Sequence, residues 1–307
     1  MTDNIPQQTP IFAAIDVGSN ASRLLIKQLQ TESNGKQRLR KLLFLRVPLR
    51  LGMEVFTDGK LSKEKAEQFI RTMKAYRQLM KVYGVDRYRA CATSAMRDSD
   101  NGKKVMKAIE KEAHIKLEII SGDEESQIVY DNHLSLLPSD GNFLYVDVGG
   151  GSTECTFIHN GERIHSHSYN VGTIRLLKGK VTPEVKAEMQ AELREVTNGY
   201  HNITIVGSGG NINKLYRLAN KREKLADRLP VDTLYKLHAA LAPLSVEERM
   251  DTFSLKADRA DVIVPAAEIF LAVAESVSAA SIQVPNLGLA DGIINEMVQD
   301  YQCKQRA

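Results

Sequence analysis

The sequence FAAIDVGSNASRLLI, residues 12–26, returns in a second version, LYVDVGGGSTECTFI, at residues 144–158. When the two stretches are aligned, Asp16 falls on Asp147, at an offset of 131 residues. Each copy begins as a short apolar run closed by turn residues and then resumes as apolar sequence, which predicts a strand, a tight turn and a second strand. Two hairpins closed by Asp-Gly turns would explain either copy alone, but the repetition with matching flanks indicates a duplicated domain.

The turns of the two copies have the composition of phosphate-binding loops. Backbone N–H groups can approach a ligand closely where no Cβ intervenes. A carboxylate at the strand end would repel phosphate unless a divalent cation lay between them, and Mg²⁺ is commonly held by one or two carboxylates, waters and phosphate oxygens. Asp16 and Asp147 are therefore candidate metal ligands. The candidate phosphate-binding residues of the two turns are Gly18, Ser19, Asn20, Gly149, Gly150 and Gly151.

A third glycine-rich turn lies within NITIVGSGGNINKL, residues 202–215. It follows an apolar run and leads into a predicted helix, so its amides are placed to receive an anion or a nucleotide. None of these turns is a Walker A loop, because no Gly-Lys-Ser/Thr follows, and the first two do not open the helix that a dinucleotide fingerprint requires. The candidate anion-binding residues of the third turn are Gly207, Ser208, Gly209 and Gly210.

Length and composition limit the class of protein. A chain of 307 residues is long enough for two domains. Its 41 basic and 38 acidic residues give a net charge of +3, so no global field favours nucleic acid or an anionic membrane as a partner. Cys91, Cys155 and Cys303 form no disulfide framework, which favours a cytoplasmic location. The first ten residues do not resemble a signal peptide, and charges interrupt the apolar region 262–285, so we expect no membrane span.

The stretch KQRLRKLLFLRVPLRLG, residues 36–52, carries six basic residues up to Arg50 and no acid. Its partly alternating pattern is typical of a strand whose basic side chains are solvated, and a path for a polyanion is the alternative, with Arg50 as the candidate contact. The next segment, residues 61–84, predicts a long helix whose aromatic residues pack against a sheet. Strands and helices continue to alternate, which argues for an α/β fold with a mixed sheet.

Seven blocks of the sequence together resemble the exopolyphosphatase and guanosine pentaphosphate phosphohydrolase (Ppx/GppA) family. They are AIDVGSNASRLLI, ATSAMRD, IISGDEESQIVY, LYVDVGGGSTE, NVGTIRL, IVGSGGNINKL and LKADRADVIVPAAEI, in that order from Ala14 to Ile269. The resemblance implies two ribonuclease-H-like domains of the actin-like ATPase superfamily, with mixed sheets flanked by helices and an active-site cleft between the domains. We expect the domains to span residues 1–128 and 129–307.

The resemblance also implies roles for individual residues. Glu125 matches the catalytic glutamate of the family and would orient or deprotonate the attacking water, with Glu124 as the alternative. As acids of a helix's first turn, both also suit capping alone. Glu154 matches an acidic position that suits metal binding or water orientation. Further candidate phosphate ligands are the guanidinium groups and turn hydroxyls of Arg23, Arg97, Arg259, Thr93, Ser94, Ser152 and Thr153.

The implied activity is hydrolysis of the terminal phosphoanhydride of inorganic polyphosphate with Mg²⁺ or another divalent cation. Long members of the family thread polyphosphate through extra C-terminal domains that this chain lacks, so short chains are the expected substrate. Asn211 stands where family members often have Thr, which leaves chain-length preference open. The alternatives are hydrolysis of guanosine pentaphosphate, a guanosine tetraphosphate or pentaphosphate sensor with little turnover, and a kinase or chaperone ATPase. The family commonly forms dimers, and the apolar helix near residues 262–280 suits either a core or a dimer interface.

Overall fold

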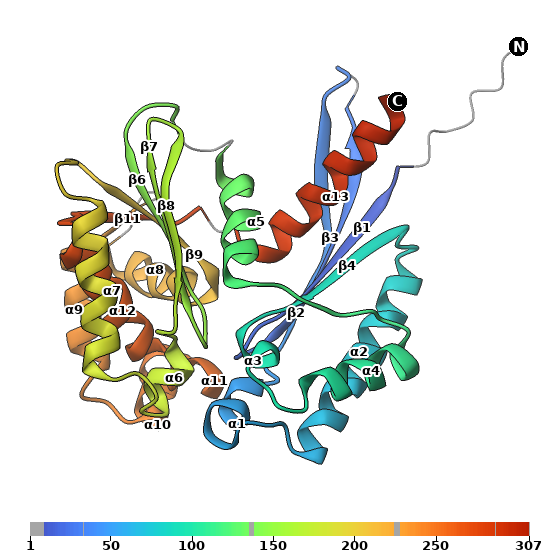
Figure 1. Cartoon of the computed structure of the whole chain (residues 1–307), viewed down its shortest axis with the longest axis horizontal. Coiled ribbons are helices and arrows are strands. Elements are labelled where there is room, and N and C mark those ends of the chain that lie inside the picture. The colour runs from blue at the N-terminus through green and yellow to red at the C-terminus, as the bar shows by residue number, and fades with distance from the viewer. Residues whose placement is uncertain (1–8, 33, 135–137, 224–227, 286, 307) are drawn as a thin grey trace, which may run out of the picture.

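The computed structural model describes residues 9–32, 34–134, 138–223, 228–285 and 287–306. These residues form two lobes, each built on a mixed β-sheet flanked by helices (Figure 1). The predicted α/β class with two mixed sheets is confirmed. The expectation about a signal peptide falls almost entirely outside the described residues.

The first sheet has the strand order β3-β2-β1-β4-β5. Strands β1, β2 and β3 form an antiparallel meander, and β4 and β5 continue the sheet parallel to β1. Hairpin pairing places Asp16 opposite Arg23, next to the turn that joins β1 and β2. The strands are β1 Ile11–Val17, β2 Ser22–Thr31, β3 Gln37–Val47, β4 Arg87–Ala92 and β5 Glu118–Ile119.

The second sheet repeats the first. Read from β8, its order is β8-β7-β6-β9-β11, with the same relative directions, and β10 is added at the far edge. Asp147 pairs with Glu154 as Asp16 pairs with Arg23, so the duplication predicted from the sequence is a duplicated ribonuclease-H-like sheet. The strands are β6 Asn142–Val148, β7 Thr153–His159, β8 Glu162–Tyr169, β9 Thr204–Ser208, β10 Arg228–Pro230 and β11 Ser281–Gln283.

Helices cover both faces of the first sheet. Ala13 and Ile15 of β1 pack among the helices of one face, whereas Phe12 and Ala14 contact the core of the other, so the strand is apolar on both sides. The first face carries α1 Leu51–Asp58, α2 Lys63–Val82, α3 Ser94–Arg97 and α4 Gly102–Ala113; the second carries α5 Gly122–Leu134 and α13 Leu289–Arg306.

The aromatic side chains of α2 lie inside the first lobe, as the sequence predicts. Phe69 and Tyr76 are fully buried among the residues that pack against the sheet, and the Tyr76 hydroxyl donates a hydrogen bond to the Ser22 carbonyl oxygen at 3.1 Å. These rings are therefore structural.

The second lobe is built around α12, Ile263–Ser276. Most side chains of this helix are buried against neighbouring helices and the sheet, so the apolar segment that the sequence left open between core and interface belongs to the core of this chain. Around it lie α6 Thr173–Leu177, α7 Pro183–Val196, α8 Gly209–Glu223, α9 Val231–Leu241, α10 Val246–Phe253 and α11 Ala257–Ala260.

The C-terminal helix α13 returns to the first lobe. It packs against α5 and the strands β1, β2 and β4, and its Ile293 and Ile294 are fully buried there (Figure 1). Helix α5 runs through residue 128, where the sequence predicts the domain boundary. A division at residues 128 and 129 stays a prediction.

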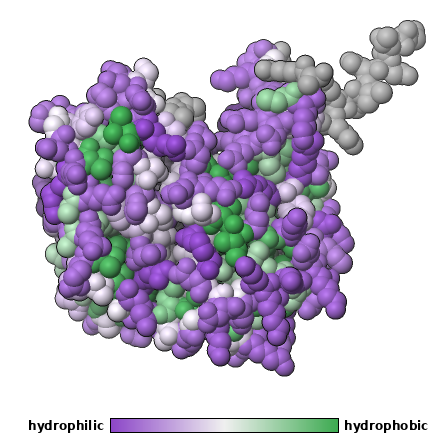
Figure 2. Space-filling view, in the orientation of Figure 1, coloured by the Kyte–Doolittle hydropathy of each residue, from purple (hydrophilic) through white to green (hydrophobic). Residues whose placement is uncertain are grey.

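Hydrophilic residues predominate on the face drawn in Figure 2, where the hydrophobic residues form several separate patches. Within the described ranges, no helix has both the length and the apolar character needed to cross a bilayer. Cys91 and Cys155 are buried free thiols and Cys303 is an exposed one. A homodimer stays a prediction.

The close packing of α13 on α5 can be tested at Gly292. A Cβ at this position would lie 2.6 Å from the Ile128 carbonyl oxygen, whereas a Cβ at Gly288 would meet nothing within 4 Å. We expect Gly292→Ala to lower the free energy of unfolding by about 1–3 kcal/mol through overpacking. Gly288→Ala, the matched control, should change it by less than about 0.5 kcal/mol. Denaturant unfolding measures both, and equal stability of the two variants would contradict this packing.

Candidate active site

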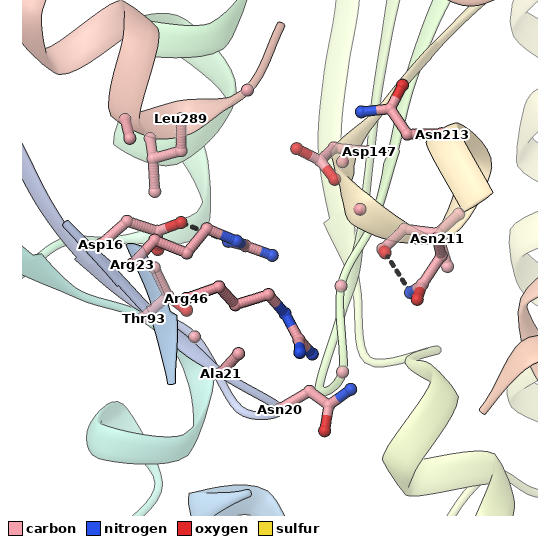
Figure 3. Close-up of a pocket in the computed structure, with 18 of the residues that line it drawn as sticks. Asp16, Asn20, Ala21, Arg23, Arg46, Thr93, Asp147, Asn211, Asn213 and Leu289 are labelled. Atoms are coloured by element: carbon pink, nitrogen blue, oxygen red, sulfur yellow. Dashed lines mark hydrogen bonds and ion pairs between the residues drawn. The ribbon is translucent and has the colours of Figure 1, made fainter. Parts of the chain in front are cut away.

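The two hairpin turns open into one cleft of about 360 Å³ between the lobes. Figure 3 shows side chains from both lobes pointing into this space, among them Arg23 and Arg46 from one side and Asp147 from the other. The predicted site residues that line the cleft are Asp16, Gly18, Ser19, Asn20, Arg23, Thr93, Ser94, Glu125, Asp147, Gly149, Gly150, Ser152, Gly209, Gly210 and Arg259.

The first hairpin presents an internally balanced pair of charges. Asp16 is 2% exposed and forms an ion pair with Arg23, its partner across the strands. Burial alone would lower the pKa of Arg23, but the carboxylates of Asp16, Asp147 and Glu125 raise it above its usual value. Arg23 therefore keeps its positive charge within the cleft. A metal-binding role for Asp16 stays a prediction, since its carboxylate already has a cationic partner.

The second hairpin presents two acids at the equivalent positions. The Ser208 hydroxyl donates a hydrogen bond to Asp147 Oδ2 at 3.1 Å, and the Ser168 hydroxyl donates to Glu154 Oε1 at 2.8 Å. Burial is the main cause that raises the pKa of Asp147 to about 6 and that of Glu154 to about 7. The first hairpin therefore places an acid opposite a base, whereas the second places two acids opposite each other.

Glu125 reaches this negative region from the first turn of α5. The turn is capped by Ser121, whose hydroxyl accepts a hydrogen bond from the Glu124 amide at 3.0 Å, and both acids lie in the first turn of the helix, as the sequence predicts. The neighbouring Glu124 carboxylate instead pairs with Arg89 at 2.7 Å and does not line the cleft. Glu125 lines it, and its Oε2 atom is buried and has no hydrogen-bond partner among the described residues. Of the two acids, Glu125 is the one available to a ligand.

Burial and neighbouring carboxylates both disfavour the charged forms of the acids at the cleft. Burial raises the pKa of Glu125 well above its usual value, and Glu154, Asp147 and Asp16 raise it further. No group of three or more His, Cys, Asp and Glu side chains within the described residues is arranged to hold a metal by itself. A hard cation held by one or two carboxylates, with waters and substrate oxygens as its other ligands, fits this donor set.

Several predicted phosphate ligands serve the protein's own structure. The Thr153 hydroxyl donates to the Val171 carbonyl oxygen, and Arg97 donates to the Ile120 carbonyl oxygen at 2.7 Å. A Cβ on Gly151 would collide with Ser94, so this glycine permits contact between the lobes. The predicted residues that do not line the cleft are Arg97, Gly151, Thr153, Glu154, Gly207 and Ser208. Glu154 and Arg97 still act on Glu125 through their charges.

Asn211, which departs from the family pattern, connects the third turn to the second. Its side-chain amide donates to the Val148 carbonyl oxygen at 3.0 Å, and its carbonyl oxygen accepts from Arg259 Nη1 at 2.6 Å. Arg259 also lies so close to Gly210 that a Cβ there would collide with the guanidinium. Asn211 therefore holds Arg259 at the cleft.

Some basic residues that line the cleft are not predicted from the sequence. Arg50, which it named as the candidate contact of the stretch 36–52, does not line the cleft and instead pairs with Asp261. Arg46 and Lys41 of β3 line it. A bulge between Ile26 and Lys27 shifts the register of β2 against β3, so the side-chain alternation changes phase there. The other cleft residues not predicted as ligands include Ala21, Leu25, Phe44, Asn213, Lys214, Arg217 and Asp291.

Comparison with known proteins identifies the family. The model of the Ppx/GppA phosphatase family matches residues 31–301, so this protein belongs to that family. A crystal structure of the Ppx/GppA family member from Aquifex aeolicus superposes with a TM-score of 0.75 and 26% identity, covering 95% of this chain and 98% of that one. The resemblance drawn from the sequence motifs is confirmed.

Two relatives indicate the range of the family. The guanosine-5'-triphosphate,3'-diphosphate pyrophosphatase of Aeromonas hydrophila is 24% identical over 97% of this chain, which spans 62% of that protein's length. Exopolyphosphatase 1 of Mycobacterium tuberculosis is 24% identical over 92% of this chain and 87% of its own. The names of these two relatives indicate different substrates, although both relatives are 24% identical to this chain.

The raised pKa values of the acids predict how stability depends on pH in the metal-free protein. Asp147 and Glu154 bind protons in the folded state at a pH where the unfolded chain has released them. The free energy of unfolding should therefore fall as the pH rises through about 6 and about 7. Urea unfolding with a chelator across this range measures the slope. Glu154→Gln and saturating Mg²⁺ should each flatten it, and a free energy that rises with pH would contradict the assignment.

Proposed function

We propose that this protein is an exopolyphosphatase that hydrolyses the terminal phosphoanhydride of short inorganic polyphosphate and releases orthophosphate. The observation that carries the proposal is the Glu125 carboxylate, whose buried Oε2 has no described partner and which lines a cleft shared with two glycine turns. A base beside amides and guanidinium groups is the arrangement that water attack on a phosphoryl group requires. A cytoplasmic location belongs to the same proposal.

In this mechanism Glu125 orients a water molecule and accepts its proton as the oxygen attacks the terminal phosphorus. The bond from that phosphorus to the bridging oxygen breaks, and the shortened chain leaves with the bridging oxygen. The Gly18 and Gly149 amides donate to the Ala21 and Ser152 carbonyl oxygens, so the other amides of the two turns and the guanidinium of Arg23 would stabilise charge on the phosphoryl oxygens. Positioning and electrostatics therefore supply most of the catalysis.

The residues of the second hairpin fit a divalent cation. Asp147 and Glu154 would hold it, with Asp16 as a further candidate, and substrate oxygens and waters would complete its shell. When bound, Mg²⁺ would neutralise phosphoryl oxygens and lower the cost of approaching the carboxylates. Its positive charge would also oppose the causes that raise the pKa of Glu125, which favours the basic form of that residue.

Glu125→Gln tests the assigned base. The amide keeps the shape of the side chain but cannot accept a proton, so phosphate release from tripolyphosphate should fall by at least about 100-fold while binding is largely retained. Glu124→Gln is the matched control because that neighbour pairs with Arg89 outside the cleft, and it should retain near wild-type turnover. Wild-type release by Glu125→Gln would show that the base lies elsewhere. Tight binding without release by the wild type would favour a sensor.

A second candidate function, hydrolysis of guanosine pentaphosphate, is favoured by Phe44. The Phe44 side chain lines the cleft although the residue is 53% exposed, and Lys41 and Arg217 line the same space. An exposed ring beside cations suits a planar purine that is attached to phosphates. Inorganic polyphosphate has no group to stack on it.

Phe44→Ala separates the two substrates. If a guanine ring stacks on Phe44, the variant should lose about tenfold in kcat/KM for guanosine pentaphosphate and little for tripolyphosphate. Phe44→Leu keeps apolar volume but removes the aromatic face, so it should behave like Phe44→Ala toward the nucleotide. Phosphate release under identical conditions measures both. An equal loss for both substrates would show that Phe44 recognises no base.

A further inference from the structure

Arg46 projects from β3 into the space between the lobes. In the antiparallel register of β2 and β3, Arg46 lies directly opposite Arg23, so both side chains are on the same face of the sheet. Figure 3 shows both guanidinium groups directed toward the opposite lobe. Arg46 Nη1 lies 2.6 Å from Oδ2 of Asp258, at the start of α11. One nitrogen of the guanidinium is therefore held by the opposite lobe.

Within the part of the chain that the structure describes, the other two nitrogens of this guanidinium donate to no hydrogen-bond acceptor. Arg46 Nε and Nη2 are both buried, and neither finds a hydrogen-bond acceptor among the described residues. Buried charged donors are normally satisfied, because leaving them unpaired forfeits their hydration without replacement. Arg46 also lines the cleft, so these two donors are available to an anion that enters it.

The charges around Arg46 favour an anion as the missing partner. Burial lowers the pKa of Arg46, Asp258 opposes this effect, and Arg23 adds to it. Burial, which is the largest cause, together with Arg46 and Arg23 lowers the pKa of Arg259 to about 9. Arg23 pairs with Asp16 and Arg46 with Asp258, whereas Arg259 donates to the neutral side chain of Asn211. The cleft is thus negative around Glu125 and positive around Arg46.

We propose that Arg46 is a phosphate-binding residue that holds the non-terminal phosphates of the substrate through Nε and Nη2, while Asp258 fixes its orientation through Nη1. This inference rests on the proposed function, because it names the part of the same cleft that receives the rest of a phosphate chain. A guanidinium can present two parallel N–H groups to two phosphate oxygens, which an ammonium cannot do. The terminal phosphate lies toward Glu125, and the chain extends toward Arg46.

Arg50 provides a matched control within the same segment. It also forms an ion pair across the lobes, to Asp261, three residues beyond the partner of Arg46. It does not line the cleft. Replacing either arginine removes one cross-lobe ion pair, but only replacement of Arg46 removes donors from the cleft.

The test compares Arg46→Met, Arg46→Lys and Arg50→Met. Binding of tripolyphosphate is measured by calorimetry in the Glu125→Gln background, and KM and kcat for phosphate release are measured in the otherwise wild-type protein. We expect Arg46→Met to weaken binding and raise KM at least tenfold with a smaller change in kcat. Arg46→Lys should recover only part of the loss, and Arg50→Met should change both quantities less than twofold.

Equal losses in Arg46→Met and Arg50→Met would overturn the inference, because the effect would then come from the lost bridge between the lobes. Unchanged binding in Arg46→Met would overturn it as well. If Arg46→Met does not fold, Arg46→Lys decides, and wild-type binding by that variant contradicts a bidentate contact. If the wild type releases no phosphate but the background variant binds tripolyphosphate through Arg46, the proposed function fails and the binding site stands.

Discussion

The turn between β6 and β7 packs directly against the turn between β1 and β2, and the rest of the site depends on this contact. A Cβ on Gly150 would lie 2.9 Å from Ser19 Cβ, so no side chain fits between the turns. The Ile174 amide donates to the Gly150 carbonyl oxygen at 2.8 Å, which fixes this turn to α6. Because the two hairpins meet at their tips, the strand-end residues behind them face one another across a single cleft.

This geometry divides the cleft by charge. On one side, burial raises the pKa of Glu125, Asp147 and Glu154, and the charges of Glu154 and Asp147 raise that of Glu125 further. On the other side, Arg46 lies close enough to Arg259 to lower the pKa of Arg259. A cation bound to the acids and a polyanion bound to the arginines would each relieve repulsion that the protein alone leaves in place. A chain of phosphates whose end is carried by a divalent cation matches both halves. The folded protein therefore contains unfavourable charge–charge interactions that bound ligands would reduce.

The sequence predicted the strand-end acids and the glycine turns because their spacing repeats and needs no tertiary information. Asp16 and Asp147 lie where the repeat puts them, in sheets of the same topology. Arg46 was missed in favour of Arg50, since the residue pattern does not show that β3 ends at Val47 and that Arg50 lies beyond it, at the start of α1.

Other features of the site depend on contacts between distant segments. Gly151 looks like a phosphate-loop glycine, yet the space at its Cα is filled by Ser94 of the other lobe. The packing of α13 on the first sheet could not be predicted for the same reason, because an amphipathic sequence does not indicate which surface the helix will cover. Local sequence patterns therefore predicted where the site lies, whereas the packing of the two lobes determines which side chains line the cleft.

The most direct test of the account is a crystal structure of Glu125→Gln with tripolyphosphate and Mn²⁺, with the metal located by anomalous scattering. The account predicts that the terminal phosphate lies in the cleft that Gly18 and Gly149 line, beside residue 125, with the metal at Asp147 and Glu154. A phosphate chain bound outside the cleft, or one whose terminal phosphate lies away from residue 125, would contradict it.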